Sequence, residues 1–149
     1  HDMVGVNSRL DSIQAAILDA KLPHLHDYTK ARQQAAAYYD KAFLNNPHIL
    51  PPVCLAASTH VYHQYTLRLV GVDRDKVREG LAQKGIPAMI YYPVPLHMQK
   101  AYQDPRYKQG DFPAAEQLAA CVLSLPMHTE LDEEQLQYIT EAVLELCKA

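Results

Sequence analysis

Apolar side chains repeat at helical spacing through the first 44 residues of the chain. Spacings of three and four residues predict an amphipathic helix that begins near Ser8 and bends or ends at Pro23. Ser8 and Asp11 resemble a capping box in which Asp replaces the usual Glu or Gln. A second helical run follows the proline, so we expect a long helical arm. The apolar positions are Leu10, Ile13, Ile17 and Ala20 in the first helix and Tyr28, Ala31, Ala35, Tyr38 and Ala42 in the second.

The pattern changes after residues 45–52, where three prolines and two asparagines predict a loop. Residues 61–69 alternate in polarity and are rich in β-formers, which predicts a strand. Asp73 begins a predicted helix that Gly85 ends, and residues 88–92 are expected to form a second strand. This order of strand, helix and strand indicates a βαβ-like or split α/β unit and leaves a mixed sheet open.

Two further helices are expected beyond the segment 92–97, which is too rich in proline for an internal strand. One begins at Asp111 and stops before Pro126, and the last is capped by Asp132 with Gln135 three residues on. The fold class expected from these patterns is α/β, more closely α+β-like. It consists of a small sheet covered by helices and preceded by the helical arm.

Composition excludes several classes of protein. The 149 residues are 48% hydrophobic, enough for a sizeable core, which excludes intrinsic disorder. The net charge is −3 and the 14 basic residues are scattered among 17 acidic ones, so we expect no nucleic-acid partner. No apolar run approaches the roughly 20 residues that span a bilayer. We therefore expect no membrane segment and a cytoplasmic protein.

Cysteine and histidine spacing argues against a metal site. The three cysteines, Cys54, Cys121 and Cys147, include no C-x-x-C pair and have apolar neighbours, so we expect them to fill the core in a reducing compartment. His60 and His63 are three residues apart, but a strand would direct them to opposite faces. We expect no metal.

The start of the first predicted helix is one candidate site. Its free backbone N–H groups and the positive end of the helix dipole favour an anion. Asn7 could donate to a phosphate oxygen, and Arg9 could pair with a phosphate or carboxylate. The alternative is that Asn7 or Ser8 only caps the helix.

A second candidate site follows the strand expected at 88–92. Tyr91 and Tyr92 precede a rigid Pro-x-Pro turn that presents His97, and together they could form a polar wall for a ligand. The alternative is a packed aromatic pair and a surface histidine. The G-x-G-x-x-G, P-loop, G-x-S-x-G and H-E-x-x-H motifs are all absent from the sequence.

An ordered series of motifs spans almost the whole chain. They are VGVNSRLD at 4–11, QAA at 14–16, GIP at 85–87, YPVPLH at 92–97, GDFPAAE at 110–116, LSLPMH at 123–128 and LDEEQ at 131–135. In this order they resemble the DegT/DnrJ/EryC1/StrS family of nucleotide-sugar aminotransferases, which use pyridoxal 5'-phosphate (PLP).

The resemblance implies the C-terminal portion of a fold-type-I PLP enzyme. Residues 1–44 would be an interdomain helical arm from the end of the large domain, and residues 45–149 the C-terminal small domain. The lysine that binds PLP in this family belongs to an upstream segment, and none of the 8 lysines here has that context. We therefore assign no catalytic residue, expect the large domain to bind most of the cofactor, and expect the chain alone to be inactive.

The resemblance also suggests roles for individual residues. Asn7 matches a residue that contacts the PLP phosphate of the neighbouring subunit, which implies a homodimer with a shared active site. Arg9 matches a residue near the sugar, and His97 one at the rim of the pocket. Tyr91 and Tyr92 stand where many relatives have His-Tyr beside the sugar. The implied reaction transfers an amino group, typically from glutamate, to a nucleotide-linked keto-sugar in surface-polysaccharide or glycan precursor biosynthesis.

Two other functions compete with this one. A non-catalytic relative, or a stand-alone domain for dimerisation or sensing, would lack the upstream lysine. A generic α/β interaction module would keep its function when Asn7 and Arg9 are replaced by Ala.

Overall fold

The helical arm begins later than the sequence pattern suggests. The computed structural model describes residues 1–148; Ala149, the last residue of the expected small domain, lies outside the described residues. Helix α1 spans Ser12–Lys21, because the Asp11 side chain accepts from the Gln14 N–H and the Gln14 side chain accepts from the Asp11 N–H. The sequence pattern predicted a capping box between Ser8 and Asp11. The structure forms it three residues later, between Asp11 and Gln14. The expected helix start near Ser8 is therefore wrong.

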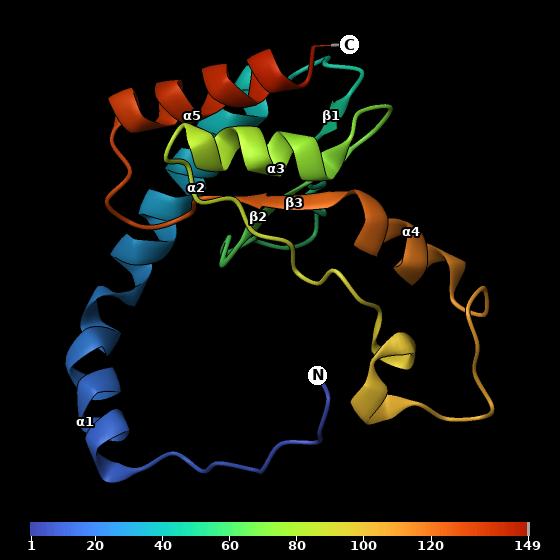
Figure 1. Ribbon diagram of the computed structural model, residues 1–149. Coiled ribbons are helices and arrows are strands. Elements are labelled where there is room, and N and C mark those ends of the chain that lie inside the picture. The colour runs from blue at the N-terminus through green and yellow to red at the C-terminus, as the bar shows by residue number, and fades with distance from the viewer. Residues whose placement is uncertain (149) are drawn as a thin grey trace.

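Pro23 interrupts the helical arm, as the sequence predicts. A 3-10 turn, η1 (Leu22–His24), contains this proline and joins α1 to α2 (Leu25–Ala42). No residue of α1 is buried, and its apolar positions Ile13 and Ile17 are exposed. Only the second half of α2 buries side chains in the core, and Figure 1 shows the first half projecting away with α1. The expected domain division after residue 44 stays a prediction.

The sheet is antiparallel throughout, so the mixed βαβ alternative is wrong. Its order is β1 (Ile49–Leu50), β2 (Tyr65–Leu69) and β3 (Val122–Leu125). Leu67 of β2 lies opposite Leu123 of β3. The segment 88–92 adds only an isolated antiparallel bridge between Met89 and Ser124.

Strand boundaries differ from the expected ones for local reasons. Residues 61–64 do not join β2, because Tyr62 has a φ of 47° and its N–H donates to the His60 ring at 2.9 Å instead of to a ladder. Strand β1 lies inside the predicted loop. Strand β3 consists of residues that the sequence pattern assigned to the end of a helix. All four are buried, and a continuous apolar run fits a buried strand as well as a buried helix.

Three helices cover one side of the sheet and form the core with it. Figure 1 shows α2 together with α3 (Arg74–Gln83) and α5 (Glu133–Leu146) on this side. The side chain of Asp73 caps α3, and Asp132 forms a capping box with Gln135 at α5, as the sequence predicts. The largest fully buried side chains are Tyr39, Phe43, Ile49, Tyr65, Leu67, Leu81, Leu123, Val143 and Cys147.

The two core tyrosines satisfy their hydroxyl groups inside the protein. Tyr39 donates to the Pro126 carbonyl at 2.9 Å, and Tyr65 donates to the Asp40 carboxylate at 2.6 Å. Burial raises the pKa of both phenols far above the ordinary value, and the bond to Asp40 raises that of Tyr65 further. Both therefore act as neutral donors that fix α2 to the sheet.

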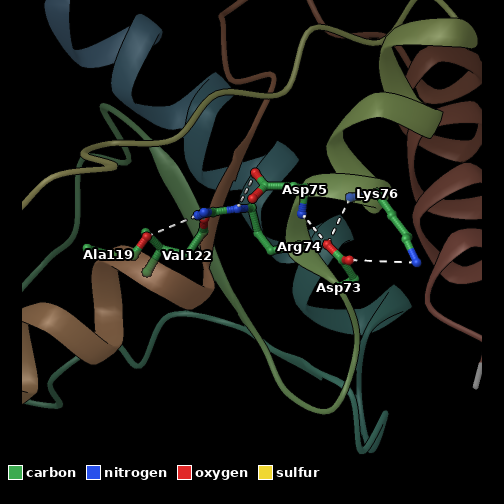
Figure 2. A network of polar contacts seen from close by, with 6 residues as sticks. All are labelled: Asp73, Arg74, Asp75, Lys76, Ala119 and Val122. Atoms are coloured by element: carbon green, nitrogen blue, oxygen red, sulfur yellow. Dashed lines mark hydrogen bonds and ion pairs between the residues drawn. The ribbon is translucent and has the colours of Figure 1, made fainter.

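Helix α4 (Pro113–Cys121) passes into β3 without a loop, and Arg74 fastens this junction. Figure 2 shows one guanidinium nitrogen, Nη1, donating to the carbonyls of Ala119 and Val122 at 3.1 Å each. The helix begins at Pro113 and not at Asp111, because proline needs no acceptor at the first helical position. Arg74 thus ties the end of α4 to the start of α3.

The structure corrects one expectation about the cysteines. Cys147 is buried and Cys121 half-buried, but Cys54 is exposed. Its neighbours Val53 and Leu55 are exposed as well, so this segment runs along the surface. Within residues 1–148, no cluster of three or more His, Cys, Asp or Glu side chains could hold a metal, and no helix is long and apolar enough to cross a membrane.

Replacing Arg74 by Met should destabilise the fold by about 1–3 kcal/mol, because Met keeps the apolar stem but leaves two carbonyls without their donor. The Ala119 carbonyl lies in the last helical turn, where no intrahelical partner exists. Urea unfolding of Arg74→Met and of Arg78→Met, an exposed arginine on the same helix, measures the difference. Equal unfolding midpoints for the two variants would contradict the role of Arg74.

The three cysteines should react with iodoacetamide in order of exposure. Cys54 should react first and Cys147 last, because burial raises the pKa of the Cys147 thiol to about 11 and only the thiolate reacts. Mass spectrometry of the native chain at neutral pH, with the urea-unfolded chain as control, gives the order. Alkylation of Cys147 at the rate of Cys54 would show that the C-terminal helix is not packed as described.

Candidate functional site

A groove of about 430 Å³ lies between residues 91–102 and helix α4. Tyr91 and Tyr92 form one wall, with ring centroids 5.7 Å apart and an edge-to-face angle of 68°. Leu118 and Ala119 of α4 form the opposite, apolar wall. Paired aromatic faces with free hydroxyl groups opposite an apolar surface suit a ligand with both polar and apolar faces, such as a sugar.

The neighbouring sequence explains why the tyrosines stand there. Met89 and Ser124 exchange two backbone hydrogen bonds, of 3.0 and 2.7 Å, which fixes the segment to β3 just before the tyrosines. Pro93 and Pro95 then keep the chain extended. The turn closes where the Met98 N–H donates to the Pro95 carbonyl at 3.0 Å, at the short 3-10 helix η2 (Leu96–Met98). A second one, η3 (Lys100–Tyr102), follows.

His97 does not face this groove, and it is not the surface histidine of the alternative interpretation. Its side chain is only 8% exposed, and its Nε2 lies 3.1 Å from Oε1 of Glu116. The imidazole packs against Phe112, with ring centroids 4.7 Å apart. His97 therefore fixes the Pro-x-Pro turn to α4.

Glu116 joins three segments. Besides His97, it accepts the Gly110 N–H, at 2.8 Å to Oε1 and 3.1 Å to Oε2. The Gly110 N–H lowers the pKa of this carboxyl, and the His97 bond lowers it further against the opposing effect of partial desolvation. Glu116 is thus a carboxylate at neutral pH.

A second pocket, of about 380 Å³, adjoins the groove. The two share Leu96, Tyr102 and Ala115, and the second pocket adds further side chains. These are His97, Asp104, Tyr107 and Phe112. Asp104 pairs with Arg106 at 2.6 Å, and this hydrogen-bonded pair lowers the pKa of the Asp104 carboxyl.

Asn7 and Arg9 lie apart from both pockets. They belong to an exposed, extended segment before α1, so the anion site expected at a helix start does not form at these residues. Neither side chain makes a hydrogen bond or ion pair within residues 1–148. Of the segment before α1, only His1 lines the groove, and its carbonyl accepts from the Ala101 N–H at 3.1 Å.

The sequence pattern did not identify the residues of α4 that line the groove or that hold the Pro-x-Pro turn. Glu116 lies 19 residues from His97, so only the fold reveals their bond. The signal was present in the GDFPAAE motif, where Gly110 has a φ of 95° and an acidic side chain follows in the first turn of a helix.

The side chains of this chain fit only part of a PLP site. None of its lysines lines either pocket; all are exposed except Lys84, which pairs with Glu145 at 3.0 Å. Asn7 and Arg9 carry unpaired donors that suit a phosphate group. The chain therefore fits contact with the cofactor phosphate and not its covalent attachment.

Comparisons with known proteins agree on one relationship. The profile of the DegT/DnrJ/EryC1/StrS aminotransferase family matches residues 1–144. A "Pleiotropic regulatory protein" of Geobacillus stearothermophilus is 43% identical over 97% of this chain and 39% of its own length. A UDP-N-acetyl-3-dehydro-alpha-D-glucosamine 3-aminotransferase of Acidithiobacillus ferrooxidans is 43% identical over 96% of this chain and 37% of its own.

Solved structures show the same fold. The crystal structure of S. venezuelae DesV matches with a TM-score of 0.88 and 36% identity, over 100% of this chain and 40% of that one. The chain thus spans about two-fifths of the length of the relatives that it matches. The small antiparallel sheet, its covering helices and the ordered motifs place the chain in one family: it belongs to the DegT/DnrJ/EryC1/StrS aminotransferase family.

Proposed function

We propose that this chain forms the substrate-side wall of an aminotransferase that moves an amino group from glutamate to a nucleotide-linked keto-sugar in surface-polysaccharide or glycan precursor biosynthesis. The observation that carries the proposal is the groove beside Tyr91 and Tyr92, in a chain of this family. Similar proteins named as acting on UDP- and dTDP-linked sugars support it.

The groove supplies the contacts that a sugar needs. The hydroxyl groups of Tyr91 and Tyr92 can donate to and accept from sugar hydroxyls, while their rings cover the apolar face of the sugar. Leu118 and Ala119 exclude water from the opposite side. The rigid Pro93 and Pro95 hold the tyrosines before the substrate arrives, which lowers the entropic cost of binding.

Asn7 and Arg9 would act in a second copy of the chain. Both are exposed donors on a segment that leaves the core of its own chain. We propose that Asn7 contacts the PLP phosphate of the partner subunit and that Arg9 lies beside the sugar, which makes the enzyme a homodimer with shared active sites. PLP supplies the electron sink for amino transfer when it is bound. The residues of this chain bind and orient the reactants.

A second function is supported by one observation, the regulatory name of the Geobacillus stearothermophilus relative. A non-catalytic member would keep the groove and bind the nucleotide sugar without transferring an amino group. Incubation of the intact protein with glutamate, PLP and a nucleotide keto-sugar separates the two functions, because only an aminotransferase forms 2-oxoglutarate.

The chain by itself should not bind PLP covalently at one site, because none of its lysines lines the groove or the second pocket. After incubation with equimolar PLP and reduction with borohydride, mass spectrometry should find sparse labelling spread over the surface lysines. Stoichiometric labelling of a single lysine would overturn the expectation that the isolated chain is inactive.

Substitution of Arg9 by Ala in the intact enzyme should raise KM for the nucleotide sugar roughly tenfold or more, because hydrogen bonds to charged groups contribute about 1.5–3 kcal/mol. Arg78→Ala, which removes an exposed arginine on α3, serves as the matched control and should leave KM unchanged. Steady-state kinetics at saturating glutamate give both values. Identical KM for the two variants would favour a generic interaction module.

A further inference from the structure

Arg68 of β2 is an exposed cation on the side of the sheet opposite the three covering helices (Figure 1). Side chains alternate between the two faces of a strand. Tyr65, Leu67 and Leu69 are buried in the core that the helices form, so Thr66 and Arg68 point to the other side. Within residues 1–148, the Arg68 guanidinium makes no hydrogen bond or ion pair.

The groove beside Tyr91 and Tyr92 lies on the same side of the sheet as Arg68. Arg68 is directly opposite Val122 of β3 in the antiparallel register. Residues opposite each other project to the same face, with Cβ atoms about 4.5–5.5 Å apart. Val122 lines the groove, whose walls contain no lysine or arginine. The sheet therefore places an unpaired cation next to a groove that has none of its own.

A pair of hydroxyl groups stands beside Arg68 on this face. Thr66 lies two residues along the strand, about 7 Å away. Its Oγ1 is 2.8 Å from Oγ of Ser124. Two hydroxyl groups carry two hydrogens, and the bond between them uses only one. The other hydrogen can donate to an oxygen atom of a ligand, so this part of the face suits a carboxylate.

The amino donor of the proposed function brings carboxylates to this region. Donor and keto-sugar use one reaction centre in turn, as in other reactions with two half-steps, so the carboxylates of glutamate have to be held close to the sugar groove. Arg74, another arginine at β3, is already engaged by the carbonyls of Ala119 and Val122 and by Asp75. Arg68 is not engaged and can pair with a carboxylate.

We propose that Arg68 binds a carboxylate of the amino donor, with the hydroxyl pair of Thr66 and Ser124 as a further hydrogen-bond donor. The proposal rests on the proposed function and extends it to the site of the second substrate. A guanidinium can bind a carboxylate through two parallel hydrogen bonds, which fix the orientation of the donor as well as its position. Arg68 thus acts in the half-reaction that consumes glutamate and not in the one that consumes the keto-sugar.

The two half-reactions of the intact holoenzyme, followed separately by the absorbance of the cofactor, test the proposal. Arg68→Met removes the cation, so the glutamate concentration that gives half the maximal rate should rise roughly ten- to hundredfold, the range for hydrogen bonds to a charged group. Arg68→Lys keeps the charge but not the paired geometry and should lie in between. The half-reaction with the keto-sugar should be unchanged, which also shows that the variant is folded. Arg78→Met, on α3, is the matched control and should behave as wild type.

Binding of glutarate, measured by isothermal titration calorimetry, gives a readout that needs no reaction. Glutarate has both carboxylates of glutamate but no amino group, and Arg68→Met should bind it at least tenfold more weakly than wild type does. Equal affinity of the two proteins, no binding by wild type, or a defect confined to the keto-sugar half-reaction would overturn the proposal. Failure of the proposed function has a different signature: glutamate yields no 2-oxoglutarate with wild type, and glutarate binding still tests Arg68.

Discussion

The direct passage of α4 into β3 is the constraint on which the candidate site depends. No loop separates Cys121 from Val122, so the direction of the helix follows from the strand. The strand is held in register by Leu123 opposite Leu67, and Arg74 locks the junction through two carbonyls. Because one wall of the groove belongs to α4, the sheet and this arginine set its position.

The opposite wall depends on the same strand. Met89 pairs with Ser124 of β3, and the two tyrosines follow at positions 91 and 92. Both walls are therefore anchored to β3, one through covalent continuity and the other through backbone hydrogen bonds. The bond between His97 and Glu116 then joins the turn that follows the tyrosines to the first turn of α4. The ligand surfaces are loops and exposed rings, and the hydrogen bonds of Met89 and His97 hold them against β3 and α4.

The sequence predicted the features of this fold that depend on neighbouring residues. The caps of α3 and α5 follow from Asp73 and Asp132, whose side chains bond within three residues. The sequence could not predict β1 and β3, because strand pairing depends on partners far along the chain. For the site, it singled out Tyr91 and Tyr92 but not Glu116, whose bond to His97 exists only after folding. It also placed Asn7 at a helix start that the stronger capping box moved to Asp11.

The central claim is that this chain provides the surface against which a nucleotide sugar binds. A crystal structure of the intact enzyme with its nucleotide-sugar product tests it most directly. We expect the sugar between the Tyr91–Tyr92 pair and α4, and Asn7 at a cofactor phosphate of the other subunit. A product that contacts none of these residues would contradict it.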